Sequence, residues 1–201
     1  MSIVLRRLLA LLILAAAAPI VLVFVAGIQA VSPGQLFFRQ SRVGLHGKVF
    51  RMWKLRTMQL GAESRLRTLL RVDAAAAAEW GAYGRLHNDP RIVGPFGRWA
   101  RQLSIDEVPQ LINVACGDMA FIGPRPLPPD QATAIDARVR GMRESVLPGM
   151  TGLWQVRGRS ETTLRQMVKL DLIYLQRRTV LLDLYVLWRT PRAIICSRGA
   201  Y

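Results

Sequence analysis

The hydrophobic pattern begins with a long apolar run near the N-terminus. No charged residue occurs between Leu8 and Phe38, and Pro19 lies near the middle of this run. The arms on either side of the proline, Leu8–Ala18 and Ile20–Val31, would each be about 16–18 Å long as helices. The hydrocarbon core of a bilayer is about 30 Å thick, so neither arm would cross it alone. The pattern predicts a helix that is broken near Pro19.

The charges that flank this run are basic on both sides. They are Arg6 and Arg7 before it, and Arg39, Arg42, Lys48, Arg51, Lys54 and Arg56 after it. A membrane-spanning helix carries its basic excess on one side, the cytoplasmic one. Residues 1–31 are therefore expected to form a re-entrant helix that enters the membrane and returns to the same face. Two alternatives remain: a secretory signal peptide ending in the alanines of residues 15–18, and a transmembrane helix kinked at Pro19.

Beyond Ser32-Pro33-Gly34 the periodicity changes. Alternating positions predict strands over Gln35–Gln40 and Val49–Leu55, joined by a turn at residues 44–47. Helical patterns follow, in residues 59–81, 130–144, 162–177 and 179–195. The last of these suits a helix lying in the membrane interface, with a buried terminal helix as the alternative. The fold class is therefore α+β and mainly helical, with a small β-hairpin and interfacial amphipathic helices.

Composition restricts the partners. The chain is 51% hydrophobic, yet it carries 28 Lys and Arg against 13 Asp and Glu, for a net charge of +15. This combination favours a membrane surface or polyanionic ligands. Nucleic acid is not expected as a partner, because no zinc-finger, homeodomain or RNP pattern occurs. Cys116 and Cys196 are far apart and lack metal-ligand spacing, which indicates neither a disulfide scaffold nor a zinc site.

A further helix is predicted to begin at a capping box. Ser104 is followed three residues later by Glu107, and Gly117 provides a natural end after Ala115. Asp106 and Glu107 would then lie in the first turn, where each carboxylate stabilises the helix dipole by about 0.3–1 kcal/mol. Helix capping alone would be a sufficient reason for this pair of residues.

The surroundings of the pair favour a chemical role instead. Adjacent helical residues point about 100° apart, so Asp106 and Glu107 suit different tasks, one at a reacting atom and one at a metal ion or proton. Arg101 precedes the pair, and Arg125 follows it within a stiff Gly-Pro-Arg-Pro segment. A guanidinium held between two prolines is well suited to binding phosphate.

These motifs resemble a known signature. The run Ser-Ile-Asp-Glu-Val-Pro-Gln-Leu-Ile-Asn-Val, then Gly-Asp-Met and Phe-Ile-Gly-Pro-Arg-Pro, is similar to the bacterial sugar transferases, the monotopic phosphoglycosyl transferases. The hairpin residues and a later Thr-Gly-Leu-Trp-Gln-Val segment continue the match. The resemblance implies a re-entrant helix in one leaflet, although the family's Ser-Pro break is Ala18-Pro19 here. Residues 32–201 would form a cytosolic, membrane-associated catalytic domain.

The resemblance also implies a reaction. Such enzymes transfer a sugar-1-phosphate from a UDP-sugar to undecaprenyl phosphate and release UMP. We expect Asp106 to be the nucleophile, giving a phosphosugar-aspartyl intermediate, and Glu107 to hold Mg²⁺ with Asp106 or to deprotonate the acceptor. The residues expected to bind substrate phosphates are Arg101, Arg125, Lys54 and Arg56, and those expected in the substrate pocket are Pro124, Pro126, Trp154 and Gln155.

The same resemblance sets the remaining expectations. The Thr-Gly-Leu-Trp-Gln-Val segment is similar to members that transfer hexose-1-phosphate, glucose or galactose, with an N-acetylhexosamine donor as the alternative. The product would start an exopolysaccharide, O-antigen or capsule glycan, at the cytoplasmic face of the bacterial inner membrane. Downstream glycosyltransferases and a second copy of the chain are possible partners. A non-catalytic basic membrane adaptor is the alternative from another class.

Overall fold

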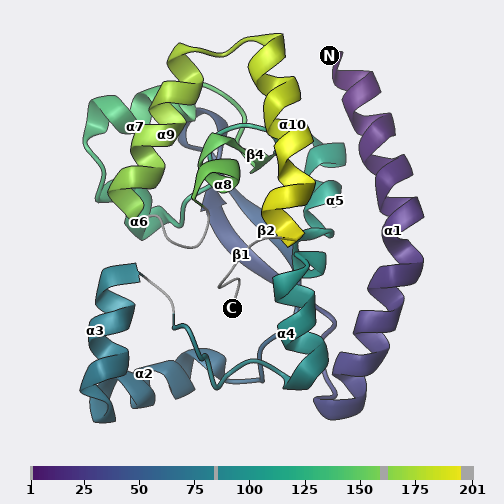
Figure 1. Ribbon diagram of the computed structural model, residues 1–201, viewed down its shortest axis with the longest axis vertical. Coiled ribbons are helices and arrows are strands. Elements are labelled where there is room, and N and C mark those ends of the chain that lie inside the picture. The colour runs from purple at the N-terminus through teal and green to yellow at the C-terminus, as the bar shows by residue number, and fades with distance from the viewer. Residues whose placement is uncertain (1, 84–85, 159–162, 196–201) are drawn as a thin grey trace.

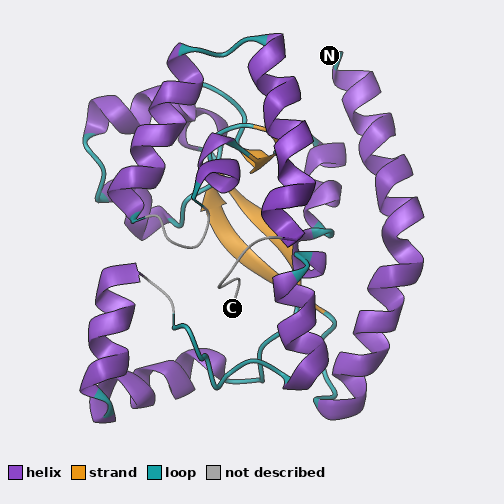
Figure 2. Ribbon diagram, viewed as in Figure 1, coloured by secondary structure: helices purple, strands orange, loops and turns teal. Residues whose placement is uncertain are grey.

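The computed structural model describes residues 2–83, 86–158 and 163–195. It is mainly helical with two small sheets, as predicted (Figures 1 and 2). The order of the elements is α1 Ile3–Val31, β1 Phe37–Val43, the 3-10 turn η1 Leu45–Gly47, β2 Val49–Leu55, α2 Ala62–Val72, α3 Ala74–Tyr83, α4 Gly94–Gln102, the 3-10 turn η2 Ile105–Glu107, α5 Gln110–Cys116, β3 Ala120–Ile122, α6 Pro129–Thr133, α7 Ala137–Glu144, β4 Gly149–Thr151, α8 Leu153–Arg157, α9 Leu164–Gln176 and α10 Val180–Ile195.

The apolar run forms one continuous helix, α1, of 29 residues with Pro19 inside it. The predicted break into two arms is therefore wrong as an interruption of the helix. A proline removes only one N–H from the ladder. The Leu and Ala residues before Pro19 favour the helix, and packing against α4 supports the Val- and Ile-rich residues after it. Ser2 caps the start, and the Ser32 N–H donates to Ile28 O at the end. By length and composition α1 could cross a membrane.

One face of α1 packs on the body of the protein along both halves. In the first half, Ala10 is fully buried and joins a core with Leu111 and Val114 of α5. In the second half, Ile28 packs in a core with Ala100 of α4. Gly27 has no room for a side chain, because a Cβ there would overlap the Phe96 ring. Figure 1 shows α4 and α5 lying beside α1 over much of its length.

The predicted hairpin is confirmed, with its first strand shifted toward the C-terminus. Strands β1 and β2 pair antiparallel from Phe37↔Leu55 to Val43↔Val49. On β2, Phe50 and Met52 alternate into the α5 core, while the intervening residues face outward. The hairpin therefore carries its functional side chains on a framework fixed against α5.

Two predicted helices are each divided by an aspartate. Asp73 separates α2 from α3, and its Oδ1 accepts from the Ala76 N–H. Asp136 separates α6 from α7, and its Oδ1 accepts from the N–H groups of Arg138 and Val139. Both act as N-caps, which explains why a continuous helical pattern splits. Figure 1 shows α2 and α3 set apart from the rest of the molecule at the lower left.

The C-terminal helices α9 and α10 occur where they were predicted. Thr163 and Gln166 form a capping box that starts α9. Val186 of α10 is fully buried, while a row of large apolar side chains on the same helix remains exposed. Its members are Val180, Leu181, Leu184, Leu187, Trp188 and Ile195. This exposed apolar face is the one expected of an interfacial helix.

Candidate active site

The two carboxylates lie on a short turn rather than in a helix. Asp106 and Glu107 belong to η2, and α5 starts only at Gln110, after Pro109. Ser104 has a left-handed backbone with φ of +57°, and its side chain does not cap the turn. The predicted capping box is therefore wrong. Because η2 is only three residues long, helix-dipole stabilisation no longer explains the carboxylate pair. We refer to residues 104–109 as the carboxylate turn.

Lys54, near the end of β2, joins this turn. Its Nζ lies 3.3 Å from Glu107 Oε1, and the side chains are 18% and 21% exposed. Burial lowers the pKa of Lys54, while the charges of Glu107 and Asp106 act in the opposite direction. Lys54 thus lies within electrostatic reach of both carboxylates and is close enough to Glu107 to donate a charged hydrogen bond.

Asn113 fixes α5, the helix that follows the carboxylate turn, against the hairpin. Its Oδ1 accepts from the Trp53 N–H at 2.9 Å, and its Nδ2 donates to Arg51 O at 2.9 Å. Nδ2 also donates to Asp118 Oδ2 at 3.2 Å. The side chain therefore pairs with the edge of β2 as a strand would, and it is buried. This role was not predicted, because only a contact over some 60 positions reveals it.

Arg125 lies in the Gly-Pro-Arg-Pro segment after β3, which we call the Arg125 loop (residues 123–126). The loop is held by β4, since Gly149 N donates to Pro124 O at 2.9 Å and Gly123 N donates to Thr151 O at 3.0 Å. A Cβ on Gly149 would collide with the backbone of Gly123. The guanidinium of Arg125 lies 4.8 Å from the centre of the Trp154 ring. Trp154 therefore provides a buried floor beneath it.

A buried ion pair holds the Arg125 loop from behind. Arg143 of α7 donates from Nη2 to Asp171 Oδ2 of α9 at 2.8 Å, and from the same nitrogen to Arg125 O at 2.7 Å. Asp171 is fully buried. Burial raises its pKa to about 6, although the charge and hydrogen bonds of Arg143 act against that rise. Neither residue was predicted as part of the site.

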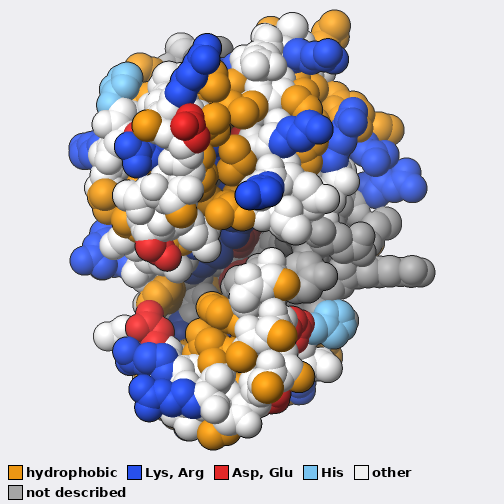
Figure 3. All heavy atoms as spheres, turned by 90° about the vertical axis from the view of Figure 1, so that its left-hand side faces the viewer, with side chains coloured by type: hydrophobic (Ala, Val, Ile, Leu, Met, Phe, Trp, Pro, Cys, Tyr) orange, Lys and Arg blue, Asp and Glu red, His pale blue; other side chains and the backbone are white. Residues whose placement is uncertain are grey.

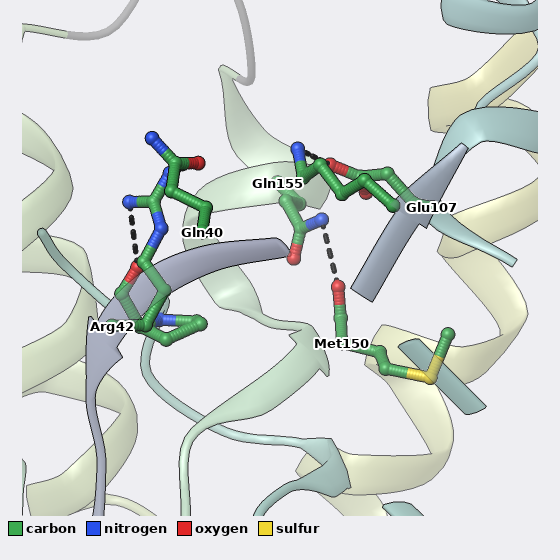
Figure 4. A network of polar contacts seen from close by, with 7 residues as sticks. Gln40, Arg42, Glu107, Met150 and Gln155 are labelled. Carbon is green, nitrogen blue, oxygen red and sulfur yellow. Dashed lines mark hydrogen bonds and ion pairs between the residues drawn. The ribbon is translucent and has the colours of Figure 1, made fainter. Parts of the chain in front are cut away.

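Arg42 of β1 is a further buried cation at this place. Its Nη1 donates to Pro126 O at 3.1 Å, and its Nη2 donates to Gln40 Oε1 at 2.6 Å (Figure 4). Burial lowers its pKa to about 9, and Arg125 adds to the effect, whereas Glu107 and Asp130 oppose it. Arg42 therefore lies between the Arg125 loop and the carboxylate turn. In the sequence, Arg42 stands two residues after Gln40 in the predicted hairpin, which places both side chains on the same face of a strand. This spacing was the available signal that Arg42 belongs to the site.

The other two predicted phosphate ligands, Arg56 and Arg101, have different partners in the structure. Arg56 donates to Ser32 Oγ and to Ser32 O, which ties the end of β2 to the end of α1. Arg101 lies on α4, where its charge helps to lower the pKa of Asp89; burial raises that pKa, but hydrogen bonds from Arg91 outweigh burial. Among the predicted phosphate-binding cations, Lys54 and Arg125 are within electrostatic reach of each other, and Lys54 is within reach of both carboxylates.

The predicted pocket residues lie in the Arg125 loop or in α8. Pro124 and Pro126 are buried, and Gln155 is half-buried with its Nε2 donating to Met150 O at 3.0 Å. Figure 3 shows the surface hollowed between the α2–α3 lobe and the rest of the molecule, with acidic and basic side chains inside the hollow. Charged groups are thus accessible from this side.

The carboxylates define what kind of metal the site could hold. Among the described residues, no group of three or more His, Cys, Asp or Glu is placed to hold a metal ion. Mg²⁺ is commonly held by one or two carboxylates together with substrate phosphates. Asp106 and Glu107, next to cations suited to phosphate, fit a magnesium ion that arrives with a diphosphate rather than one bound by the protein alone.

Carboxylates among basic side chains suit phosphorylated ligands, and α1 is long and apolar enough to associate with a membrane. The chain belongs to the bacterial sugar transferase family, whose model matches residues 2–197. It is accordingly an enzyme, a transferase, and the adaptor alternative is set aside.

Named relatives agree with this family. The exopolysaccharide production protein ExoY of Sinorhizobium fredii is 34% identical over 194 residues, which cover 96% of this chain and 85% of that protein. The UDP-glucose:undecaprenyl-phosphate glucose-1-phosphate transferase of Caulobacter vibrioides is 37% identical, over 92% of this chain and 66% of that protein. The undecaprenyl-phosphate galactose phosphotransferase of Salmonella typhimurium is 39% identical, over 84% of this chain but 35% of its own length.

Proposed function

We propose that this enzyme transfers a hexose-1-phosphate from a UDP-hexose to undecaprenyl phosphate. The observation that carries the proposal is the convergence of Lys54, Arg42 and Arg125 on the Asp106–Glu107 turn, within one electrostatic cluster. Cations so placed suit a diphosphate, and the carboxylates suit nucleophilic attack and metal binding. The names of the Caulobacter and Salmonella relatives, a glucose-1-phosphate and a galactose phosphotransferase, favour a hexose donor over an N-acetylhexosamine.

The chemistry would proceed in two displacements. A carboxylate oxygen of Asp106 attacks the phosphorus that bears the sugar, the bond from that phosphorus to the bridging oxygen breaks, and UMP leaves with the electron pair. A phosphate oxygen of undecaprenyl phosphate then attacks the same phosphorus, and Asp106 is released as a carboxylate. Glu107 would accept the acceptor's proton where the acceptor arrives as a monoanion. Lys54 and Arg125 would neutralise the charge on the transferred group.

Mg²⁺ would be held by Asp106 and Glu107 together with the diphosphate, and would supply charge neutralisation there. The existing contact between Glu107 and Lys54 keeps one carboxylate oriented before any substrate binds. Orientation before binding reduces the reorganisation that the transition state requires.

We further propose that α1, as one continuous helix, lies in one leaflet with both of its ends at the same face, and that the enzyme is monotopic at the cytoplasmic face of the inner membrane. Support comes from packing: α4 and α5 lie against α1 in both of its halves, with Ala10 and Ile28 buried. If α1 crossed the bilayer, α4 with Arg98 and Arg101 would have to enter the hydrocarbon with it. The opposite face of α1 and the apolar face of α10 remain exposed for lipid.

The test is single-turnover reaction of purified enzyme in detergent with UDP-glucose or UDP-galactose and Mg²⁺. UMP release, together with a sugar-phosphate adduct on the chain, is expected before any acceptor is added. The Asp106→Asn variant should release no UMP, whereas Glu63→Gln, at an exposed position of α2, should keep most activity. UMP release by Asp106→Asn at the native rate would overturn the nucleophile assignment. Turnover restricted to N-acetylated donors would overturn the hexose assignment.

A further inference from the structure

Two glutamine amides near the carboxylate turn are each held by one end. Gln40 Oε1 accepts from Arg42 Nη2 at 2.6 Å. Gln155 Nε2 donates to Met150 O at 3.0 Å. A primary amide has an acceptor end and a donor end, so fixing one end defines what the other presents. Gln40 therefore presents its NH₂ group, and Gln155 presents its carbonyl oxygen.

The two amides belong to two separate elements of the fold. Gln40 comes from β1 and Gln155 from α8, and Figure 4 shows Gln40 close to Arg42, and Gln155 on the side of the view where Glu107 lies. Both side chains are half-buried. They are neutral, whereas the neighbouring groups of the cluster are charged.

Buried donors beside these amides also lack a partner. Within the described part of the chain, Arg42 Nε and Trp154 Nε1 are buried and make no hydrogen bond. Arg42 holds Gln40, and Trp154 immediately precedes Gln155. Buried polar groups are ordinarily paired, and each unpaired one calls for a ligand or a water molecule. Hydrogen-bond acceptors, such as oxygen atoms of a ligand, would therefore satisfy these two donors beside the amides.

Charged and neutral groups suit different parts of the proposed donor. The cations suit the diphosphate, because charge-assisted hydrogen bonds favour phosphate oxygens. A sugar hydroxyl is neutral and both donates and accepts, so one fixed donor and one fixed acceptor match it. Building on the proposed function, we propose that Gln40 and Gln155 recognise the sugar ring: Gln155 Oε1 accepts from one hydroxyl, and Gln40 Nε2 donates to another.

The experiment compares Gln155→Met and Gln40→Met with the wild type in UMP release. These substitutions keep the side-chain length and remove the amide. Gln176→Met, at the exposed end of α9, is the matched control. We expect kcat/KM for the UDP-hexose to fall about tenfold in each site variant, the size of a lost hydrogen bond to a buried polar group. Inhibition by UMP, which lacks the sugar, should be unchanged.

Deoxy analogues of the donor sharpen the assignment. In the wild type, removing the hydroxyl read by Gln155 should lower kcat/KM about as much as Gln155→Met does. In Gln155→Met the same analogue should react like the parent donor. Weaker UMP inhibition in the variants, or unchanged kcat/KM, would overturn the proposal. Failure of the wild type to release UMP from any UDP-sugar would instead overturn the proposed function, so the two failures are distinguishable.

Discussion

The two halves of the site are held by different forces. The carboxylate turn is held by the neutral side chain of Asn113 on the edge of β2 and by the partly exposed Lys54–Glu107 pair. The Arg125 loop is held by a buried ion pair, Arg143–Asp171. Neutral hydrogen bonds do not titrate, whereas a buried carboxylate does. We therefore expect substitutions and changes of pH to affect the stability of the two halves in different ways.

The largest effect on stability is expected from Asp171→Ala. It leaves the Arg143 guanidinium buried without its counter-ion, which typically costs about 3–5 kcal/mol. Thermal or urea unfolding in detergent should show the loss. The double variant Arg143→Leu with Asp171→Leu should be closer to the wild type, because removing both charges leaves none unpaired. Additive losses in the double variant would mean that the pair does not act as a unit.

The pH response of the Arg125 loop follows from the pKa of Asp171, raised from 3.8 to about 6 in the folded protein. Between these values the folded state binds more protons than the unfolded one, so this residue's contribution to the free energy of unfolding falls as pH rises from about 4 to about 6. Asp171→Asn should lack this slope. Its UMP release should also lack a decline below pH about 6 that the wild type shows, because protonated Asp171 no longer pairs fully with Arg143. Parallel pH profiles would contradict the assignment.

On the carboxylate turn, Asn113→Ala should cost about 1–3 kcal/mol, because it leaves the Trp53 N–H and the Arg51 carbonyl without their partner. The loss should not change between pH 5 and pH 8. Asn88→Ala, at an exposed position, is the control and should be near neutral. A marked pH dependence would show that charge, not the amide, holds this half.

The sequence predicted the local elements better than the links between them. The hairpin, α9 and α10 follow from periodicity over neighbouring residues. The Asn113 contact to Trp53 and the Arg143–Asp171 pair join residues 60 and 28 positions apart. The pattern of neighbouring residues in the sequence does not indicate partners that lie so far apart. The carboxylates and Arg125 were recognisable from their motifs, whereas the contact of Arg42 with the Arg125 loop joins residues 84 positions apart.

The smallest effect on stability and a large effect on activity should coincide at Lys54. Burial disfavours the charged form of Lys54, although Glu107 and Asp106 favour it. Replacing Lys54 with the apolar Met should therefore cost less stability than Asp171→Ala does. UMP release should nevertheless fall about 100-fold or more, because a cation aimed at developing charge acts mainly in the transition state. Lys54→Arg should recover part of the rate, while Lys48→Met, exposed beyond the η1 turn, should keep it. If Lys54→Met lost stability and activity in proportion, Lys54 would be a structural contact of the carboxylate turn rather than a substrate ligand.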